Sequence, residues 1–174
     1  MQVTTQTQIV EPGGFSRLGG LVRPIVELAG SVVNALNFAA PVVDLLIRFW
    51  VAKVFWLSGL SKIQSVDSTL LLFQYEYHVP VLSPAVAAYS SMFSELTFSI
   101  LLLLGLAGRF SAGVLFFVNF VAVISYPALM EAGLQEHYLW GLLLLVLIFH
   151  GPGKLSLDHF IAKWFGFGEA PQRA

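Results

Sequence analysis

The stretch PAVAAYSSMFSELTFSILLLLGL, residues 84–106, contains a single charged side chain, that of Glu95. A helix needs about 20 predominantly apolar residues to cross a bilayer, and this stretch is long and apolar enough to do so. A second apolar segment, residues 109–130, follows almost at once and has no charged side chain after Arg109. Two such segments in succession indicate an integral membrane protein.

The composition of the whole chain supports this class. Of 174 residues, 57% are hydrophobic and 11% are charged. Soluble domains are about 45–50% apolar and ~25% charged, so this chain has too few charged side chains to cover a soluble surface. The expected partner is therefore the lipid bilayer. A net charge of -1 provides no broad basic field, so nucleic acid is not an expected partner. The absence of cysteine excludes disulfides and thiol chemistry within the chain.

Residues 44–62 and 137–150 complete a predicted bundle of four transmembrane helices. Basic side chains gather on one side of it: Arg17, Arg23, Arg109, Lys154, Lys163 and Arg173. The opposite side combines Lys62 with four acids: Asp67, Glu76, Glu131 and Glu136. Because basic loops stay in the cytoplasm, both termini are predicted to be cytoplasmic. We expect an all-α, multi-pass protein of a bacterial-type inner membrane.

Residues 17–41 form a modestly apolar, amphipathic segment bounded by Pro24 and Pro41. Such a segment is typical of a helix that lies in the membrane interface. A fifth span at this place would invert the sides assigned above. The predicted organisation has four parts: a mobile tail 1–16, the interfacial helix 17–41, the membrane bundle with its terminal helix 42–165, and a tail 166–174.

Two short helices are also predicted outside the spans. The first covers residues 68–77, on the outer side, and is closed by Pro80. The second begins after Ser156, a good N-cap residue, and carries an apolar stripe through residues 157–165. The Gly-Pro-Gly sequence before it ends the fourth span, with His150 as the last residue at the cytoplasmic headgroups.

Glu95 is the strongest candidate for chemistry, because it lies near the middle of its span. A carboxylate there costs ~2.5–3.5 kcal/mol on insertion scales, and it must find a partner or line a wet cavity. The candidate partners are Arg48, Lys53, Lys62 and Asn119. Two interpretations remain open: a structural pair that locks the first two spans, or a group that binds a polar headgroup or moves a proton.

Arg48 and Lys62 share one face of the first span with Asp44. They are about 21 Å apart along a helix, too far to share a ligand. Long basic side chains can extend along the helix toward a membrane surface, and these two would extend toward opposite surfaces. The alternative for Arg48 is an ion pair with Asp44, four residues earlier.

Aromatic side chains are abundant, and most are expected to pack in the core or at the interface. A quinone ring binds between aromatic walls with one or two polar anchors. Lys62, Glu95 and Trp140 can supply these, and Arg48 is a further candidate for the cofactor site. The sequence permits such a cofactor site without requiring it, and no covalently bound cofactor is expected.

The outer side also offers nitrogen and oxygen ligands for a metal, chiefly His78, His137 and Glu76, with Glu131 and Glu136 nearby. None of them has the local spacing of a ligand pair, so no metal site is predicted and these residues stay weak candidates.

Several motifs together resemble the DoxX family of small four-helix membrane proteins. They are FWLSGLSK (residues 55–62), the turn from Pro80 to Pro84 before the span with Glu95, LLLLGLAGRF (residues 101–110) and HGPGKLSLD (residues 150–158). The similarity covers residues 42–165. The polar and glycine positions that it carries over are Arg48, Gly59, Lys62, Glu95, Gly151, Gly153 and Asp158.

The resemblance implies a four-helix transmembrane bundle and two kinds of function. The family is named for the small subunit of a thiosulfate:quinone oxidoreductase, which implies quinone-linked electron transfer from a partner subunit. Other members resemble accessory proteins, which implies a scaffold subunit without catalysis of its own. We expect an accessory role within a membrane complex or an oligomer, with the quinone-linked role as the alternative.

Overall fold

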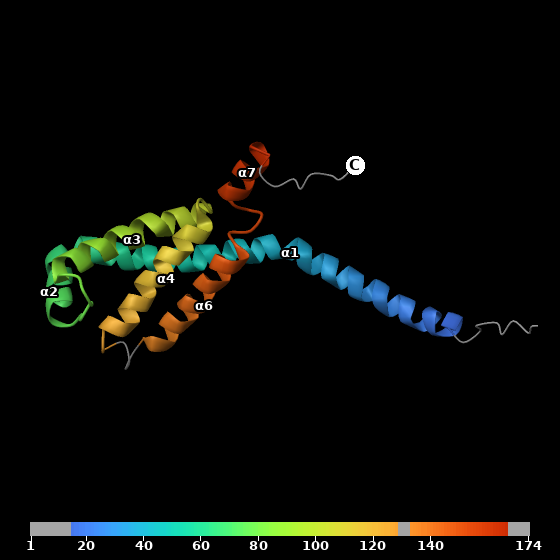
Figure 1. Ribbon diagram of the computed structural model, residues 1–174, viewed down its shortest axis with the longest axis horizontal. Helices are drawn as coiled ribbons and strands as arrows, with labels where there is room; N and C mark the ends of the chain where they lie inside the picture. The colour runs from blue at the N-terminus through green and yellow to red at the C-terminus, as the bar shows by residue number, and fades with distance from the viewer. Residues whose placement is uncertain (1–14, 129–132, 167–174) are drawn as a thin grey trace, which may run out of the picture. The chain divides into compact units, whose positions relative to one another are not determined.

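The computed structural model describes residues 15–128 and 133–166. Helices are the only regular secondary structure in these residues, which confirms the all-α prediction (Figure 1). The helices are α1 (Phe15–Gln64), α2 (Val66–Tyr75), α3 (Pro84–Leu104), α4 (Gly108–Ser125), α6 (Leu134–His150) and α7 (Leu157–Trp164). The predicted tails fall almost entirely outside the described residues, as does Glu131.

α3 and α4 are each long and apolar enough to cross a membrane, while α6 is a shorter apolar helix. Two of the four predicted spans thus coincide with helices that are candidate membrane spans by length and composition, and the four-span bundle stays a prediction. α4 ends at Ser125, where Tyr126 adopts an extended backbone, so this helix stops short of the predicted residue 130. The two short helices are confirmed as α2 and α7, and the Ser156 side chain caps α7 by accepting a hydrogen bond from the backbone N–H of His159.

α1 is longer than expected. The prediction that a separate helix ends at Pro41 is wrong, because α1 continues from Phe15 through Pro24 and Pro41 to Gln64. A proline removes one backbone hydrogen bond, but its fixed φ is compatible with a helix, so the helical path can continue. The chain divides into two compact units, residues 1–39 and 40–174. The placement of residues 17–41 at the membrane interface stays a prediction.

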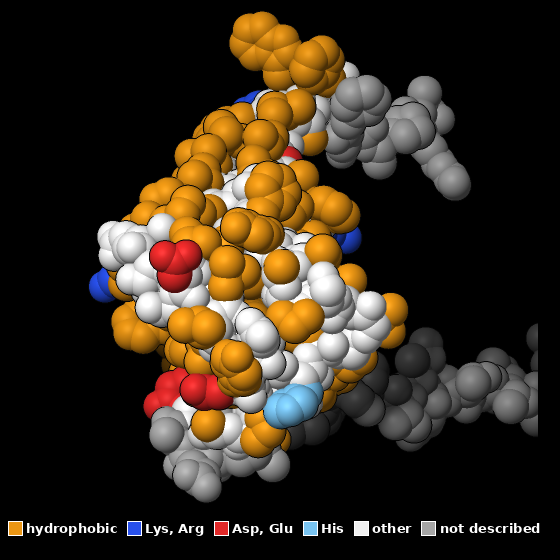
Figure 2. All heavy atoms as spheres, turned by 90° about the vertical axis from the view of Figure 1, so that its left-hand side faces the viewer, with side chains coloured by type: hydrophobic (Ala, Val, Ile, Leu, Met, Phe, Trp, Pro, Cys, Tyr) orange, Lys and Arg blue, Asp and Glu red, His pale blue; other side chains and the backbone are white. Residues whose placement is uncertain are grey.

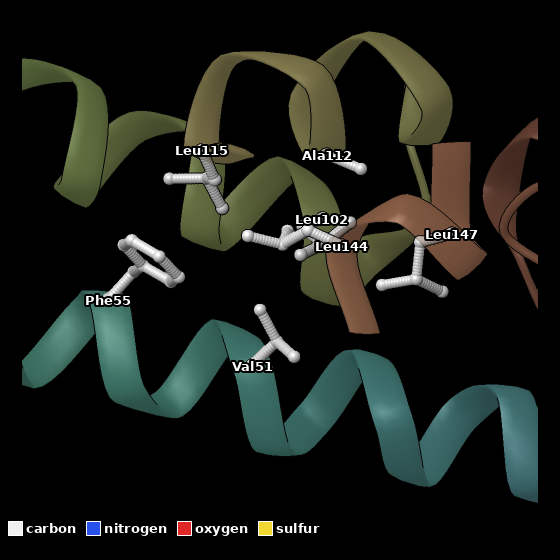
Figure 3. Close-up of a cluster of buried hydrophobic side chains, with 7 residues drawn as sticks. All are labelled: Val51, Phe55, Leu102, Ala112, Leu115, Leu144 and Leu147. Carbon is white, nitrogen blue, oxygen red and sulfur yellow. The ribbon is translucent and has the colours of Figure 1, made fainter. Parts of the chain in front are cut away.

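The second unit has one main hydrophobic core, to which four helices contribute (Figure 3). Its buried members are Val51 and Phe55 of α1, Leu102 of α3, Ala112 and Leu115 of α4, and Leu144 and Leu147 of α6. Short connections place consecutive helices side by side, so that α3 packs on α4 and α4 packs on α6. The turn between α3 and α4 needs Gly105, which has a φ of +66° and closes α3 with a left-handed residue.

The end of the unit that carries α7 is tied together by polar contacts. The carboxylate of Asp158 accepts hydrogen bonds from the backbone N–H groups of Ala107 (2.8 Å) and Gly108 (2.7 Å), at the start of α4. The N–H of Asp158 donates to the carbonyl of Gly105 at 2.9 Å. Asp158 therefore satisfies donors that the first turn of α4 would otherwise leave free.

Arg48 is fully buried at this same end, which is incompatible with extension to a membrane surface. Its Nη2 group donates to the carbonyl oxygen of Leu155, in the segment that leads to α7. The predicted ion pair with Asp44 is replaced by this contact, although Asp44 and Asp158 are near enough to act electrostatically on the guanidinium. Asp44 itself lies 3.5 Å from Nε2 of His150.

Hydrophobic side chains cover much of the outer surface of the second unit. Figure 2 shows them over most of the face at the α2 end, where acidic, basic and histidine side chains form isolated spots. Phe93 of α3, Phe117 of α4 and Leu142 of α6 are each more than 60% exposed. Such a surface is suited to contact with lipid chains rather than with water.

Candidate functional site

Glu95 and Lys62 form a close ion pair between α3 and α1. The Lys62 ammonium lies 2.8 Å from Oε1 and 2.6 Å from Oε2 of Glu95. The side chain of Glu95 is only 6% exposed and that of Lys62 only 14%, so both charges are largely removed from solvent. Because a buried ion loses its hydration, each charge depends on the other for compensation.

Two serines complete the pair, each from the same helix as its partner. Lys62 donates to the hydroxyl of Ser58 at 2.7 Å, and Ser91 donates to Oε1 of Glu95 at 3.0 Å. Both serines precede the charged residue by four positions, which places them on the same helix face. The ammonium and the carboxylate are therefore each hydrogen-bonded to a neutral serine hydroxyl as well as to each other.

Gly59 allows α1 and α3 to approach closely beside this pair. A Cβ atom on Gly59 would lie 2.8 Å from Cγ of Leu96 and 3.2 Å from Cβ of Glu95. A side chain at this position would therefore push the two helices apart. The glycine of the FWLSGLSK motif thus keeps the ammonium within reach of the carboxylate.

The ion pair lines a cavity of about 740 Å³ inside the second unit. α1, α3, α4 and α6 all contribute to its walls, together with α2 and the loop that follows it. The walls are mainly apolar and include Phe55, Phe73 and Trp140, and the polar groups are few. Binding sites for small molecules are typically ~300–1,000 Å³ and have this combination of apolar walls and a few placed polar groups.

A second polar cluster faces the cavity from α4 and α6. Nδ2 of Asn119 donates to the carbonyl of His137 at 2.9 Å, and Nδ1 of His137 lies 2.8 Å from Oδ1 of Asn119. An amide oxygen only accepts, so in this arrangement Nδ1 of His137 carries a proton and donates it to Asn119. The ring of His137 also packs against that of Trp140, with centroids 4.7 Å apart.

A stack of three aromatic rings stands at the end of the cavity nearest α2. Tyr77 lies between Phe73 and Tyr126, with ring centroids 4.5 Å apart on each side. Burial, reinforced by the negative charge of Glu95, raises the pKa of Tyr77 to about 12. The Tyr126 side chain hydrogen-bonds Glu76, and this contact, after burial, helps to raise the pKa of Tyr126.

The structure brings together three of the predicted site residues, Lys62, Glu95 and Trp140, in one cavity. Of the four candidate partners of Glu95, Lys62 is the one that forms an ion pair with it. Arg48 does not belong to this site, because its guanidinium is sealed against Leu155 at the α7 end.

The weak metal candidates are not brought together. His137 is bonded to Asn119, Glu76 to Tyr126, and His78 is exposed. Within residues 15–128 and 133–166, no three His, Asp or Glu side chains form a group that could hold a metal ion.

Ser58, Ser91 and Tyr77 are among the polar residues of the cavity wall that were not singled out from the sequence. The spacing of four residues before Lys62 and before Glu95 is a signal for the two serines. Tyr77 had no such signal, because its place in the wall depends on how the loop after α2 folds back.

Comparison with known proteins identifies the family of this chain. The DoxX family model matches residues 43–128, a range that includes Arg48, Lys62 and Glu95. An uncharacterized protein of Haemophilus influenzae is 36% identical over 126 residues, and the alignment covers 68% of this chain and 83% of that protein. No solved structure matches the chain. The chain therefore belongs to the DoxX family of membrane proteins.

Proposed function

We propose that this protein is a four-span membrane subunit that holds the ring of a quinone at the Lys62–Glu95 pair and links a partner subunit to the quinone pool. The observation that carries the proposal is the buried ion pair in the wall of an apolar cavity of about 740 Å³. A cavity with this lining matches the general form of a site for a flat, mostly apolar ring with polar oxygens.

The four spans in this proposal are the part of α1 around residues 44–62, followed by α3, α4 and α6. Since α6 has 17 residues, it is at the short end of the range for a transmembrane helix. The basic side chains of Arg109, Lys154 and Lys163 belong to the α7 end, and this distribution supports the part of the proposal in which the termini are cytoplasmic and the α2 end lies on the other side.

The groups in the wall fit a quinone by their chemistry. Ring carbonyl oxygens need hydrogen-bond donors. Ser58 accepts from Lys62 and has its own hydroxyl hydrogen to offer, whereas Lys62 and Ser91 donate to Glu95 and would exchange such a bond for one to the quinone. The ring faces can pack against Phe55 and Trp140, whose own rings are in contact with centroids 6.4 Å apart. A bound quinone supplies two-electron, two-proton redox chemistry. In that chemistry, Glu95 is the group of this chain placed to hold or release a proton.

Binding measurements on the protein in nanodiscs of phosphatidylcholine test the proposal. The probe is a dimethoxy-methyl-benzoquinone with a decyl chain, and its affinity is expressed per quinone dissolved in the bilayer. We expect Glu95→Gln and the double variant Lys62→Met/Glu95→Met to bind at least tenfold more weakly. Asp67→Asn, which changes an exposed carboxylate on α2 outside the cavity, should bind as the wild type does. Unchanged binding in the folded cavity variants would contradict the proposal.

A second candidate is the accessory role without catalysis. The observation that favours it is the mutual satisfaction of Lys62 and Glu95, which suits a pair that locks α1 onto α3. In that role, the protein purified from its native membrane would retain protein subunits in fixed stoichiometry. It would also show no quinone affinity that depends on Glu95. Affinity for quinone without any associated subunit would argue against this role.

A further inference from the structure

We propose that the cavity opens sideways into the bilayer between α3 and α4, so that its ligand carries an apolar chain that leaves through this gap while its ring stays at Lys62 and Glu95. This inference rests on the proposed function and adds how the ligand arrives and what shape it has. The observations that carry it are the two helix faces that border the gap and the distribution of polar groups from the rim to the interior.

The face of α4 that borders the gap is one continuous stripe of apolar side chains. Val114, Phe117, Val121 and Ile124 all lie within about 40° of the direction of Phe110 on a helix. Near the turn this stripe packs on α3, where the rings of Phe110 and Phe98 are 5.7 Å apart in an edge-to-face contact. Farther along α4, the remaining members of the stripe line the cavity instead.

The border on α3 follows the same pattern. Ser94, Ser91 and Ala87 continue the helix face that begins with Phe98, and all three line the cavity. The side chains at these positions are small. The two helices diverge from their connecting turn, as Figure 1 shows, so large side chains fill the space near the turn and small ones leave it open farther away.

On α4 the rim of the gap is apolar and exposed, whereas the ion pair in the interior is buried. Phe117, Phe120 and Ile124 line the cavity and are nevertheless 64%, 50% and 54% exposed. Glu95, by contrast, is 5% exposed. A site that admitted a water-soluble ligand would present its polar groups at the rim, so this order favours a ligand that comes from an apolar phase.

The position of the gap along the two helices also favours a ligand that comes from the bilayer. Ser94 lies near the middle of α3, and Phe117 lies near the middle of α4. At ~1.5 Å per residue, both positions are about 12 Å or more from the ends of their helices. In a helix that spans the membrane, such positions face the hydrocarbon core, which is about 30 Å thick. A chain that leaves between them therefore enters the acyl region of the bilayer directly.

The test compares two probes with the same ring in phosphatidylcholine nanodiscs, one with a decyl chain and one with no chain. Both affinities are expressed per quinone dissolved in the bilayer, which removes the effect of partition. The gap variant is Ser94→Phe. Its matched control is Val86→Phe, because Val86 is 50% exposed on α3 and outside the cavity wall. Helical content and thermal midpoint are measured for both variants.

We expect the wild type and Val86→Phe to bind both probes. Ser94→Phe should lose at least tenfold in affinity for the decyl probe and much less for the ring alone, which fits inside the narrowed cavity. Three outcomes would overturn the proposed gap while leaving the proposed ring site intact. Ser94→Phe could lose equal affinity for the two probes, or it could lose affinity for neither. The third outcome is a wild type that binds only the ring without a chain. If the wild type bound neither probe, the proposed function would fail and the gap with it.

A labelling experiment on the wild type does not depend on any variant. A diazirine on the decyl chain should label α4 around Phe117 and Phe120 upon illumination, and excess unlabelled decyl probe should suppress this labelling. Labelling confined to α2 or to the loop after it would show that the chain leaves toward the aqueous side, which contradicts the proposal.

Discussion

Nζ of Lys62 lies 2.6 Å from Oε2 of Glu95, although the two residues are 33 positions apart in the chain. The contact joins the last turn of α1 to the middle of α3 and places two opposite charges where the protein shields them from most of the solvent. It neutralises both charges, and it holds two helices in register. The stability of the bundle and the properties of its cavity therefore depend on the same two side chains.

Removing one partner of this pair should be far more harmful than removing both. Lys62→Met leaves the Glu95 carboxylate buried and unpaired, and breaking a buried pair costs about 3–5 kcal/mol. The double variant Lys62→Met/Glu95→Met leaves no buried charge and should recover most of that loss. Thermal unfolding in detergent measures the free energies in a double-mutant cycle. Additive losses would show that the two charges do not depend on each other.

Substitution of two glycines by alanine should have opposite effects. Gly105 has a φ of +66°, and a Cβ atom there would overlap Nη1 of Arg48, so Gly105→Ala should lose about 2 kcal/mol or more. Gly113 lies within α4, where an added Cβ atom would meet nothing within 4 Å, so Gly113→Ala should gain about 0.5–1 kcal/mol. The difference in unfolding free energy between the two variants decides the prediction, and a Gly105→Ala protein as stable as Gly113→Ala would refute it.

Asp158 should control the order of the turn between α3 and α4. Asp158→Ala removes two hydrogen bonds to the first turn of α4, each made by a carboxylate, and should cost about 1–2 kcal/mol. Asp158→Asn keeps one acceptor oxygen and should cost less. Hydrogen exchange at residues 105–110 should be faster in both variants, most of all in Asp158→Ala, and unchanged in Asp67→Asn. Equal exchange in all three would contradict the capping role.

Alkaline pH should weaken the protein through Tyr77. The pKa of this phenol rises from 10.0 to about 12 in the folded chain, so the folded state holds the proton more tightly than the unfolded state does. The stabilising contribution is therefore complete below pH 10 and is lost as the pH rises to about 12, with a size on the order of 2 kcal/mol.

The comparison for this prediction is Tyr77→Phe, which keeps the ring between Phe73 and Tyr126 and removes the titrating group. The difference between the thermal midpoints of the two proteins should stay constant from pH 8 to about pH 10 and then change up to pH 12, because only the wild type loses stability as its phenol ionises. Parallel curves over that range would show that Tyr77 does not contribute to the pH dependence.

The local features of the fold were predictable because they depend on short stretches of chain. The length and apolarity of residues 84–106 identify a membrane helix without any knowledge of its neighbours. Ser156 identifies the start of α7, because a cap acts on residues two or three positions away. The same local reasoning failed at Pro41, where the expected helix end does not occur and α1 continues.

The sequence by itself determined that this is an all-helical membrane protein with one costly charge, Glu95, near the middle of a span. It also limited the partners of that charge to a few side chains. Only the tertiary structure decided that Lys62 is the partner, that Arg48 is sealed at the other end, and that Tyr77, His137 and Trp140 face the same cavity as the pair. The physical reason is that apolarity and capping are set within one helix, whereas ion pairing and cavities depend on the separation and rotation of helices that meet across many residues of chain.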